Sequence, residues 1–333
     1  MKAKTLVIQP LQGIGDYMWF VPHLHALAVA TPEKKISLLT RPRSFADQLS
    51  EHDTLIDEVL WLNVKKGPHD GVRGLIRLAR MLRTKKYDQV YILHSRSLRY
   101  PIACRLAGIP KVYGPGIGWQ RWFLTNPKTF LSAKNQKKHP IERGTLVLKN
   151  HRLNLNDSFF KLYLGDTAEK EAKSFLSQIK GPYIALCIGS SEATKKWPAA
   201  HFIHLAEKIY QKKKTTFLIV GGPSETVEGK NIEMALRHKK IPCAFVCGDL
   251  RRTLAILKYA QCVIGNDTGV THASPLLGVQ GLVLLGESQV PIHSYTKLEG
   301  VKVGADNQMT SPNNIQKIAP ERVSERLDAL GWI

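Results

Sequence analysis

Short apolar runs alternate with glycine-rich or polar loops along the chain, and each loop leads into a segment with helical spacing. The first such unit has an apolar strand at 4–8, a glycine-rich turn at 13–16 and a helical pattern over 18–30 that is entered through Pro22. Further apolar runs stand at 183–188, 216–220, 262–264 and 281–285. Strands that alternate with helices predict an α/β fold with parallel sheets, in which ligands bind where the strands end.

The loop after the run 262–264 combines a carboxylate, a hydroxyl and an imidazole. Asp267 and Thr268 are good N-cap residues, and Gly269 lets the backbone approach a ligand closely. His272 follows four residues after Thr268, on the helix face that looks back at the loop. The N–H groups at this helix start suit an anion, although a capped helix in an ordinary α/β domain is the alternative.

Three earlier loops also follow predicted strands. The first contains Asp16 after a glycine turn, and the second contains two serines ahead of Lys195. The third reads Gly-Gly-Pro before Glu225. Four polar or glycine-rich loops at strand ends point to one ligand-binding region more strongly than any single glycine loop would.

In this order and at these separations, the four loops resemble those of glycosyltransferase family 9, which contains the lipopolysaccharide heptosyltransferases. The resemblance covers nearly the whole chain and implies a GT-B architecture, with two Rossmann-like domains facing each other across a cleft. It implies an acceptor-binding N-terminal domain at 1–168, a nucleotide-sugar domain at 180–315 and a linker near 165–180. The helix within 316–333 is expected to pack back on the N-terminal domain. The motifs that carry the resemblance are Gly15-Asp16, Lys195 with Trp197-Pro198, Gly221-Gly222-Pro223 before Glu225, and Asp267-Thr268-Gly269 with His272.

The resemblance implies transfer of a heptose from the donor ADP-heptose to the inner core of lipopolysaccharide. It assigns Asp16 as the base that takes the proton of the acceptor hydroxyl; the alternative is that Asp16 only caps its helix. A single displacement with one base inverts the anomeric centre, and no second carboxylate pairs obviously with Asp16 in the sequence. We therefore expect an inverting transferase.

Positive charge is needed beside the departing diphosphate. Lys195 is the expected source; Lys196 is an alternative that the sequence alone does not separate, although the family register favours Lys195. No Asp-x-Asp pair stands in a plausible loop, so we expect catalysis without a metal or other cofactor. The expected donor contacts are Ser190, Ser191, Glu225 (to ribose hydroxyls), Asp267 (to sugar hydroxyls), Thr268, Gly269 and His272.

The strongly basic balance of the chain implies an acidic partner. Its 333 residues include 48 Lys and Arg against 27 Asp and Glu, a formal net charge of +21. The basic residues are scattered and no zinc-finger or RNA-recognition spacing is present, so we expect no nucleic-acid partner. An anionic membrane surface and a phosphorylated lipid A-core acceptor fit better. Arg96 and Arg99 are candidate acceptor contacts.

Other features of composition bear on location. No apolar run approaches the roughly 20 residues needed to cross a bilayer, and no signal peptide is expected at the N-terminus. The five cysteines show no paired spacing and suit free thiols in a reducing compartment. We therefore expect a cytoplasmic protein associated peripherally with the inner face of the inner membrane. The aromatic run at 119–130 either packs in the core, the favoured interpretation, or forms an acceptor wall.

Two other functions are compatible with parts of this pattern. A sugar-nucleotide epimerase shares the two-domain architecture, and turnover without an acceptor would identify it. A non-catalytic, basic membrane-surface binding protein would not need Asp16, Lys195 and Asp267 all at loop positions. The combination of these three residues therefore favours the transferase.

Overall fold

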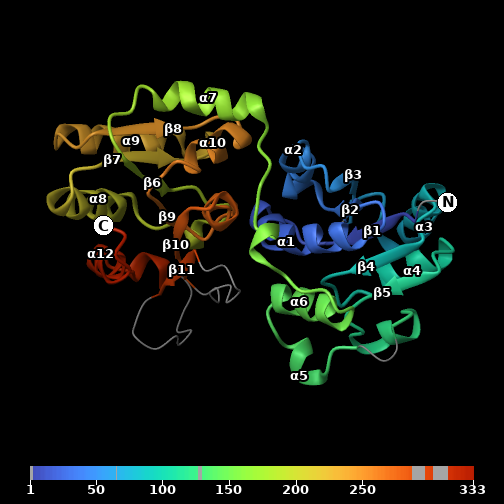
Figure 1. The fold of residues 1–333 in the computed structure, drawn as a ribbon. Coiled ribbons are helices and arrows are strands. Elements are labelled where there is room, and N and C mark those ends of the chain that lie inside the picture. Colours follow the sequence, from blue (N-terminus) through green and yellow to red (C-terminus); the bar gives the residue numbers. More distant parts are fainter. Residues whose placement is uncertain (1–2, 65, 127–129, 287–296, 303–313) are drawn as a thin grey trace. The chain divides into compact units, whose positions relative to one another are not determined.

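The computed structural model describes residues 3–64, 66–126, 130–286, 297–302 and 314–333. The chain divides into two compact units, Met1–Tyr163 and Leu164–Ile333 (Figure 1). The facing of the two domains across a cleft stays a prediction. The division falls slightly earlier than predicted because helix α7 (Asp166–Leu176) packs on α10 (Leu250–Leu257) within the second unit. Most of the linker predicted at 165–180 is therefore helix.

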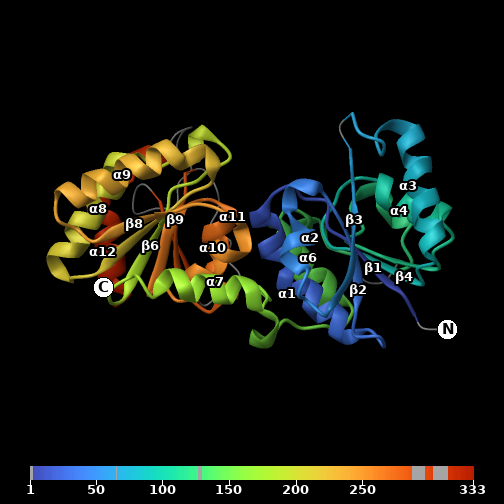
Figure 2. The ribbon, with the colours of Figure 1, turned by 90° about the horizontal axis from the view of Figure 1, so that it is seen from above.

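The first unit is built on a five-stranded parallel sheet with the strand order β3-β2-β1-β4-β5. In Figure 2, α1 and α6 lie on one face of this sheet and α3 and α4 lie on the other. Strands covered on both faces must be apolar on both sides, and β1 and β2 are buried along their whole length. The elements are β1 (Thr5–Ile8), α1 (Ile14–Ala30), β2 (Ile36–Thr40), α2 (Ala46–Ser50), β3 (Ile56–Trp61), α3 (Gly71–Lys85), β4 (Gln89–Ile92), α4 (Arg99–Leu106), β5 (Lys111–Tyr113), α5 (Ala133–Gln136) and α6 (Pro140–Asn150).

Helix α1 begins earlier than the sequence predicts. It starts at Ile14, directly after the glycine turn, and Pro22 lies inside the helix rather than at its entrance. A proline inside a helix removes one backbone hydrogen bond and costs about 3 kcal/mol. Most of α1 from Tyr17 to Ala28 is buried, so tertiary packing outweighs that cost. The early start places Asp16 in the first turn of the helix.

The aromatic run at 119–130 does not pack entirely in the core, and the favoured interpretation is wrong for two of its residues. Trp119 and Trp122 lie on a 3-10 turn, η2 (Gly118–Trp122), and their side chains are 73% and 74% exposed. Gln120, between them, is buried and donates from Nε2 to the carbonyl oxygens of Ser95 and Ser97, both at 2.9 Å. The Gln120 side chain thus ties the turn to the loop after β4. Both indoles lie at the surface.

The second unit is a six-stranded parallel sheet with the order β11-β10-β9-β6-β7-β8, the doubly wound arrangement that the sequence predicts. In Figure 2, α8, α9 and α12 lie on one face of this sheet and α7 and α10 lie on the other. Strands β6, β7 and β9 are buried throughout. The remaining elements are β6 (Tyr183–Cys187), α8 (Ala199–Lys212), β7 (Thr216–Val220), α9 (Thr226–His238), β8 (Cys243–Val246), β9 (Cys262–Asn266), α11 (Gly269–His272), β10 (Gln280–Leu284), β11 (Leu298–Val301) and α12 (Pro320–Ala329).

The C-terminal helix α12 packs on the core of the second unit. Val323 and Leu327 of α12 are fully buried in the core of the second unit, and the helix lies against α8. Leu330 and Trp332 pack against the same core. The apolar side of the helix is thus covered within the second unit, and its return to the N-terminal domain stays a prediction. None of the described helices is long and apolar enough to cross a membrane.

Candidate active site

The loop after β9 has the strand, turn and helix start that its sequence predicts. β9 ends at Asn266, and Thr268 is the N-cap of the single-turn helix α11. The Thr268 hydroxyl accepts from the backbone N–H of Val270 at 3.3 Å. Gly265 has no room for a side chain, since a Cβ there would lie 2.5 Å from Cβ of Cys187. This close approach of β9 to β6 brings the loops that follow the two strands together.

Asp267 is the centre of a three-residue array. Its Oδ1 lies 2.8 Å from Nε2 of His272, and its Oδ2 lies 3.7 Å from Nζ of Lys195. His272 is buried, and the Asp267 side chain is only 10% exposed. Lys195 comes from the loop after β6, which is the neighbour of β9 in the sheet. The structure therefore joins three predicted site residues into one array of a cation, a carboxylate and an imidazole.

Lys196 belongs to a different cluster, so the structure separates the two lysines. Its Nζ lies 3.0 Å from Oε1 of Glu225 and 3.9 Å from Oε2 of Glu228. Oε1 of Glu225 also accepts from the Ser224 hydroxyl at 2.9 Å, and Oε2 accepts from the N–H of Gly222 at 3.1 Å. Burial on its own raises the pKa of the Glu225 carboxyl, but the hydrogen bonds from Lys196 and Ser224 outweigh burial and hold the pKa below its usual range.

The contacts of Glu225 limit what else it can bind. A carboxylate has about four acceptor positions, and internal donors take two on Oε1 and one on Oε2. One position on Oε2 remains for an external hydroxyl. The predicted contact between Glu225 and ribose hydroxyls stays a prediction, and these bonds allow it at Oε2 alone.

The loop that contains Ser190 and Ser191 is closed by hydrogen bonds between a serine side chain and the backbone. The Ser190 hydroxyl donates to the carbonyl oxygen of Glu192 at 3.0 Å and accepts from its N–H at 3.3 Å. Ser191 is exposed. Ser190 thus closes a tight turn ahead of the 3-10 turn η4 (Ala193–Lys195) that carries Lys195. Phosphate contacts from the two serines stay predictions.

Asn266 supports the structure of the site, and the sequence analysis assigns it no role. Its side chain is fully buried. Oδ1 accepts from the backbone N–H of Trp197 at 3.0 Å, and Nδ2 donates to the carbonyl oxygen of Ile188 at 2.7 Å. The Trp197 indole N–H donates in turn to the carbonyl oxygen of Ile318 at 2.8 Å. An amide at the end of an otherwise apolar strand is the one sequence signal that could have identified this residue.

In the first unit, Asp16 occupies the first turn of α1 and is half-buried. Its Oδ2 accepts from the N–H of Gly13 at 2.8 Å and from that of Gln12 at 3.1 Å. The carboxylate therefore caps its own helix, which is the alternative that the sequence leaves open. A capping carboxylate can also act on a substrate, so the catalytic role of Asp16 stays a prediction.

The two candidate acceptor arginines have different surroundings. The Arg99 guanidinium donates to the carbonyl oxygens of His69 and Gly71, the latter at 3.1 Å, and so holds the start of α3. Arg96 is exposed and donates to the carbonyl oxygen of Gln136 at 3.4 Å. Arg99 thus has a structural function, and an acceptor contact stays a prediction for both residues.

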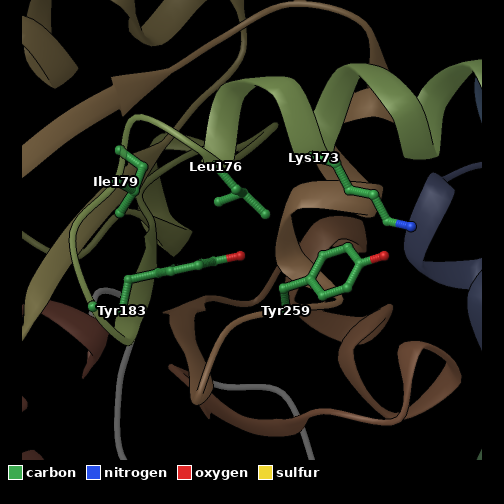
Figure 3. A pocket seen from close by; sticks show the side chains of 6 residues that line it. Lys173, Leu176, Ile179, Tyr183 and Tyr259 are labelled. Carbon is green, nitrogen blue, oxygen red and sulfur yellow. The ribbon is translucent and has the colours of Figure 1, made fainter.

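A small hollow in the second unit is not part of this site. It has a volume of about 300 Å³ and lies where β6 begins, at the sheet edge opposite to the loops described above (Figure 3). Its lining residues are Lys173, Leu176, Ile179, Gly181, Tyr183 and Tyr259. Within the described ranges, no three His, Cys, Asp or Glu side chains gather as metal ligands would. All five cysteines are free.

Comparison with known proteins gives one family. The model of glycosyltransferase family 9 (heptosyltransferase) matches residues 75–313, a range that begins after Asp16. No curated protein matches the chain.

Among solved structures, the chain is similar to a family 9 glycosyl transferase from Veillonella parvula, with 21% identity, a TM-score of 0.75 and coverage of 99% of this chain and 98% of that one. ADP-heptose LPS heptosyltransferase II of E. coli has 19% identity, a TM-score of 0.72 and 98% coverage of both chains. E. coli heptosyltransferase WaaC with ADP-2-deoxy-2-fluoro heptose has 16% identity, a TM-score of 0.67 and coverage of 98% and 99%. At identities of 16–21%, this structural similarity establishes the fold alone.

Proposed function

The chain belongs to glycosyltransferase family 9, the heptosyltransferases, and from that premise we propose that it transfers a heptose from ADP-heptose to the inner core of lipopolysaccharide. The observation that carries the proposal is the array of Lys195, Asp267 and His272 at adjacent strand ends of the second unit. Such an array offers a cation to a diphosphate and acceptors to sugar hydroxyls. We assign the donor to the second unit and the acceptor to the first.

We propose that the positive charge on the leaving diphosphate comes mainly from Lys195, without a metal ion. Helix α11 has a single turn, so its dipole adds little to this charge. Lys195 lies 3.7 Å and 3.4 Å from the carboxylates of Asp267 and Glu192, which hold the ammonium at the loop. Its side chain is 35% exposed, and a donor phosphate can reach it.

We propose that Asp16 is the base for the acceptor hydroxyl. The N–H groups that bind its Oδ2 fix the carboxylate at the sheet edge where β1 ends. A positioned carboxylate of this kind contributes about 10²-fold to 10⁴-fold to a rate. With one base and a single displacement, the transfer inverts the anomeric centre.

We further propose a peripheral association with the anionic inner face of the inner membrane, where the lipid A-core acceptor is held. The net charge of +21 supports attraction to anionic lipid. Trp119 and Trp122 support interfacial contact, because indole rings favour the boundary between lipid and water and both are exposed. Arg121 lies between them in sequence. A cytoplasmic location is part of this proposal.

Family membership favours the transferase over both alternatives. An epimerase would turn over its nucleotide sugar without an acceptor, whereas a transferase requires one. A non-catalytic binding protein would tolerate changes at Lys195 and Asp16. Each alternative therefore makes a distinct prediction for a single assay.

The assay measures ADP release from ADP-heptose in the presence of EDTA, with deacylated core acceptors of increasing heptose content. We expect release that needs one acceptor, survives EDTA and falls at least about 10²-fold in Asp16→Asn. Asparagine keeps an oxygen that can accept the helix-capping bonds, so this variant removes the base and retains the cap. Asp166→Asn, in the first turn of α7, is the matched control.

Each part of the proposal can fail separately in this assay. Activity that vanishes in EDTA and returns with a divalent ion would contradict metal independence. Full activity in Asp16→Asn would contradict the role of that base. An absence of release with every acceptor would contradict the assigned donor and acceptor.

A further inference from the structure

The last stretch of the first unit is held on helix α1 by a buried histidine. This segment, 157–163, begins with the 3-10 turn η3 (Asp157–Phe159) and ends at Tyr163, the last residue of the unit. The side chain of His25, in α1, is 1% exposed, and its Nδ1 lies 2.9 Å from the carbonyl oxygen of Phe159. The ring centres of His25 and Tyr163 lie 6.0 Å apart. The chain that leads to the second unit therefore runs past His25.

The other ring nitrogen of His25 faces a buried carboxylate. Its Nε2 lies 2.7 Å from Oδ2 of Asp53, whose side chain is 5% exposed. Asp53 stands between α2 and β3 and is fixed by its own turn. Its Oδ1 accepts from the N–H of Leu55 at 3.0 Å, and its N–H donates to the carbonyl oxygen of Ser50 at 2.9 Å. One imidazole ring therefore joins three parts of the first unit: α1, the turn before β3, and η3.

The two partners of His25 determine how many protons its ring carries. A backbone carbonyl oxygen can only accept, so Nδ1 must donate a proton to Phe159. A carboxylate oxygen 2.7 Å from Nε2 also requires a proton between the two atoms, because a lone pair of the ring would otherwise face a negative charge. Imidazole is a stronger base than carboxylate, so this proton belongs to the ring. The geometry thus makes His25 an imidazolium paired with the Asp53 carboxylate.

No other side chain in the described part of the chain forms an ion pair with Asp53. Burial raises the pKa of the Tyr17 hydroxyl in α1, and the charge of Asp53 raises it further, so Tyr17 stays neutral. His23 bonds instead to a threonine of α6, at 2.9 Å, and Arg41 bonds to a tyrosine of α4. The titratable side chains close to the pair in sequence are exposed to solvent: Glu51, His52, Asp157 and Lys161. The charge of Asp53 is therefore balanced by His25.

Loss of the proton between His25 and Asp53 would break this arrangement from within. A neutral ring that keeps its proton on Nδ1 would point a lone pair at a buried carboxylate, which would have lost its cation. A buried charge without a partner is strongly unfavourable, so the two side chains would separate and water would enter. The ring would then move away from the carbonyl oxygen of Phe159 as well. Because the closed arrangement binds a proton that the open one does not, its stability falls as the pH rises.

We propose that His25 and Asp53 form a proton-dependent clasp on the segment 157–163. With the proton, the clasp fastens this segment to α1; without it, the segment is released from the helix. Helix α1 also carries Asp16 in its first turn, so the closed clasp fixes the chain that leaves the first unit to the same helix as that residue. The clasp involves no substrate, and it therefore stands apart from the proposed function.

Hydrogen–deuterium exchange of the full chain, followed by mass spectrometry, measures whether the segment is fastened. The N–H of Phe159 donates to the carbonyl oxygen of Asn156 and that of Phe160 to Asp157, both at 3.1 Å, so peptides over 157–163 report its release. After correction for the intrinsic effect of pH on exchange, we expect their protection to fall at least about tenfold between about pH 6 and about pH 10. Peptides from β1 should keep their protection, which separates local release from global unfolding.

Asp53→Asn is the decisive variant, because it replaces the proton by a permanent donor. The amide oxygen of asparagine can accept from the N–H of Leu55, and its NH₂ group can donate to Nε2 of a neutral His25, which still donates from Nδ1 to Phe159. We expect this variant to keep the segment protected at both pH values. Asp57→Asn, the same substitution at a nearby exposed position, is the matched control and should lose protection as the wild type does.

NMR of the wild-type histidine rings keeps the test decisive if Asp53→Asn fails to fold. At about pH 8, where a free histidine is neutral, we expect the His25 ring, assigned by its contacts with Tyr163, to carry protons on both nitrogens. A neutral His25 ring at this pH, constant protection of the wild-type segment up to about pH 10, or loss of protection in Asp53→Asn parallel to the wild type would each overturn the clasp. None of these measurements uses heptosyl transfer, so a failure of the proposed function would leave them unaffected.

Discussion

Nζ of Lys196 lies 3.0 Å from Oε1 of Glu225, although the two residues are far apart in sequence. The preceding residue, Lys195, faces Asp267 instead. The two adjacent lysines therefore pair with different sets of carboxylates, and the same substitution at each should have different effects.

We expect Lys195→Gln to lower the rate of heptosyl transfer about 10²-fold to 10³-fold, because it removes charge from the leaving diphosphate. Lys196→Gln should leave most of the maximal rate but lower the Tm, because Glu225 would lose its cation. Steady-state kinetics with ADP-heptose and thermal unfolding of both variants test this division. Equal losses of rate in the two variants would contradict it.

The lowered pKa of Glu225 predicts how stability changes in acid. A carboxyl whose pKa is lower in the folded state stabilises the fold above its unfolded pKa, and this contribution is lost as the pH falls through the folded value. Glu225→Gln removes the titration, so we expect the Tm of this variant to fall less steeply than that of the wild type from about pH 5 to about pH 3. Glu171→Gln, an exposed glutamate, is the control. Parallel curves for the wild type and Glu225→Gln would be the contrary result.

The strand-end loops could be predicted because their pattern is local. The apolar run before Gly265 and the N-cap residue Thr268 specify a strand, a turn and a helix start, and the structure has all three. Alternating strands and helices likewise predicted two parallel sheets. His272 lies four residues after the N-cap Thr268 and faces back to the loop, as its spacing predicts, and there its Nε2 lies 2.8 Å from Oδ1 of Asp267.

The features that could not be predicted depend on tertiary contacts. The helical pattern of α12 shows an apolar side but does not say which core covers it. Pro22 is tolerated inside α1 because burial outweighs local propensity. The partners of Lys195 and Lys196 are set by the neighbouring strands rather than by adjacent residues. The bonds of Asn266 likewise cross between β9 and the loops after β6, and sequence does not reveal them.

Asn266→Ala should destabilise the second unit by about 2–4 kcal/mol. The change leaves a cavity, and it leaves the N–H of Trp197 and the carbonyl oxygen of Ile188 without their buried partner. The free energy of unfolding by urea measures this cost. Asn154→Ala, at an exposed position in the first unit, should change it by less than about 0.5 kcal/mol. A similarly small effect for Asn266→Ala would show that its hydrogen bonds contribute little.

Membrane association should depend on the two exposed indoles of η2. Replacing Trp119 and Trp122 together by serine removes about 150–250 Å² of apolar surface per ring, so we expect binding to vesicles of anionic and zwitterionic phospholipid to weaken about tenfold or more. The double substitution Val72→Ser and Val227→Ser is the matched control, since both valines are highly exposed. Cosedimentation at low and high salt separates the indole contribution from that of charge, because salt screens the attraction of the basic protein to anionic lipid. If the Trp double variant binds vesicles as the wild type does at both salt concentrations, η2 is not the membrane contact. If this variant loses vesicle binding only at high salt, its binding at low salt is due to charge.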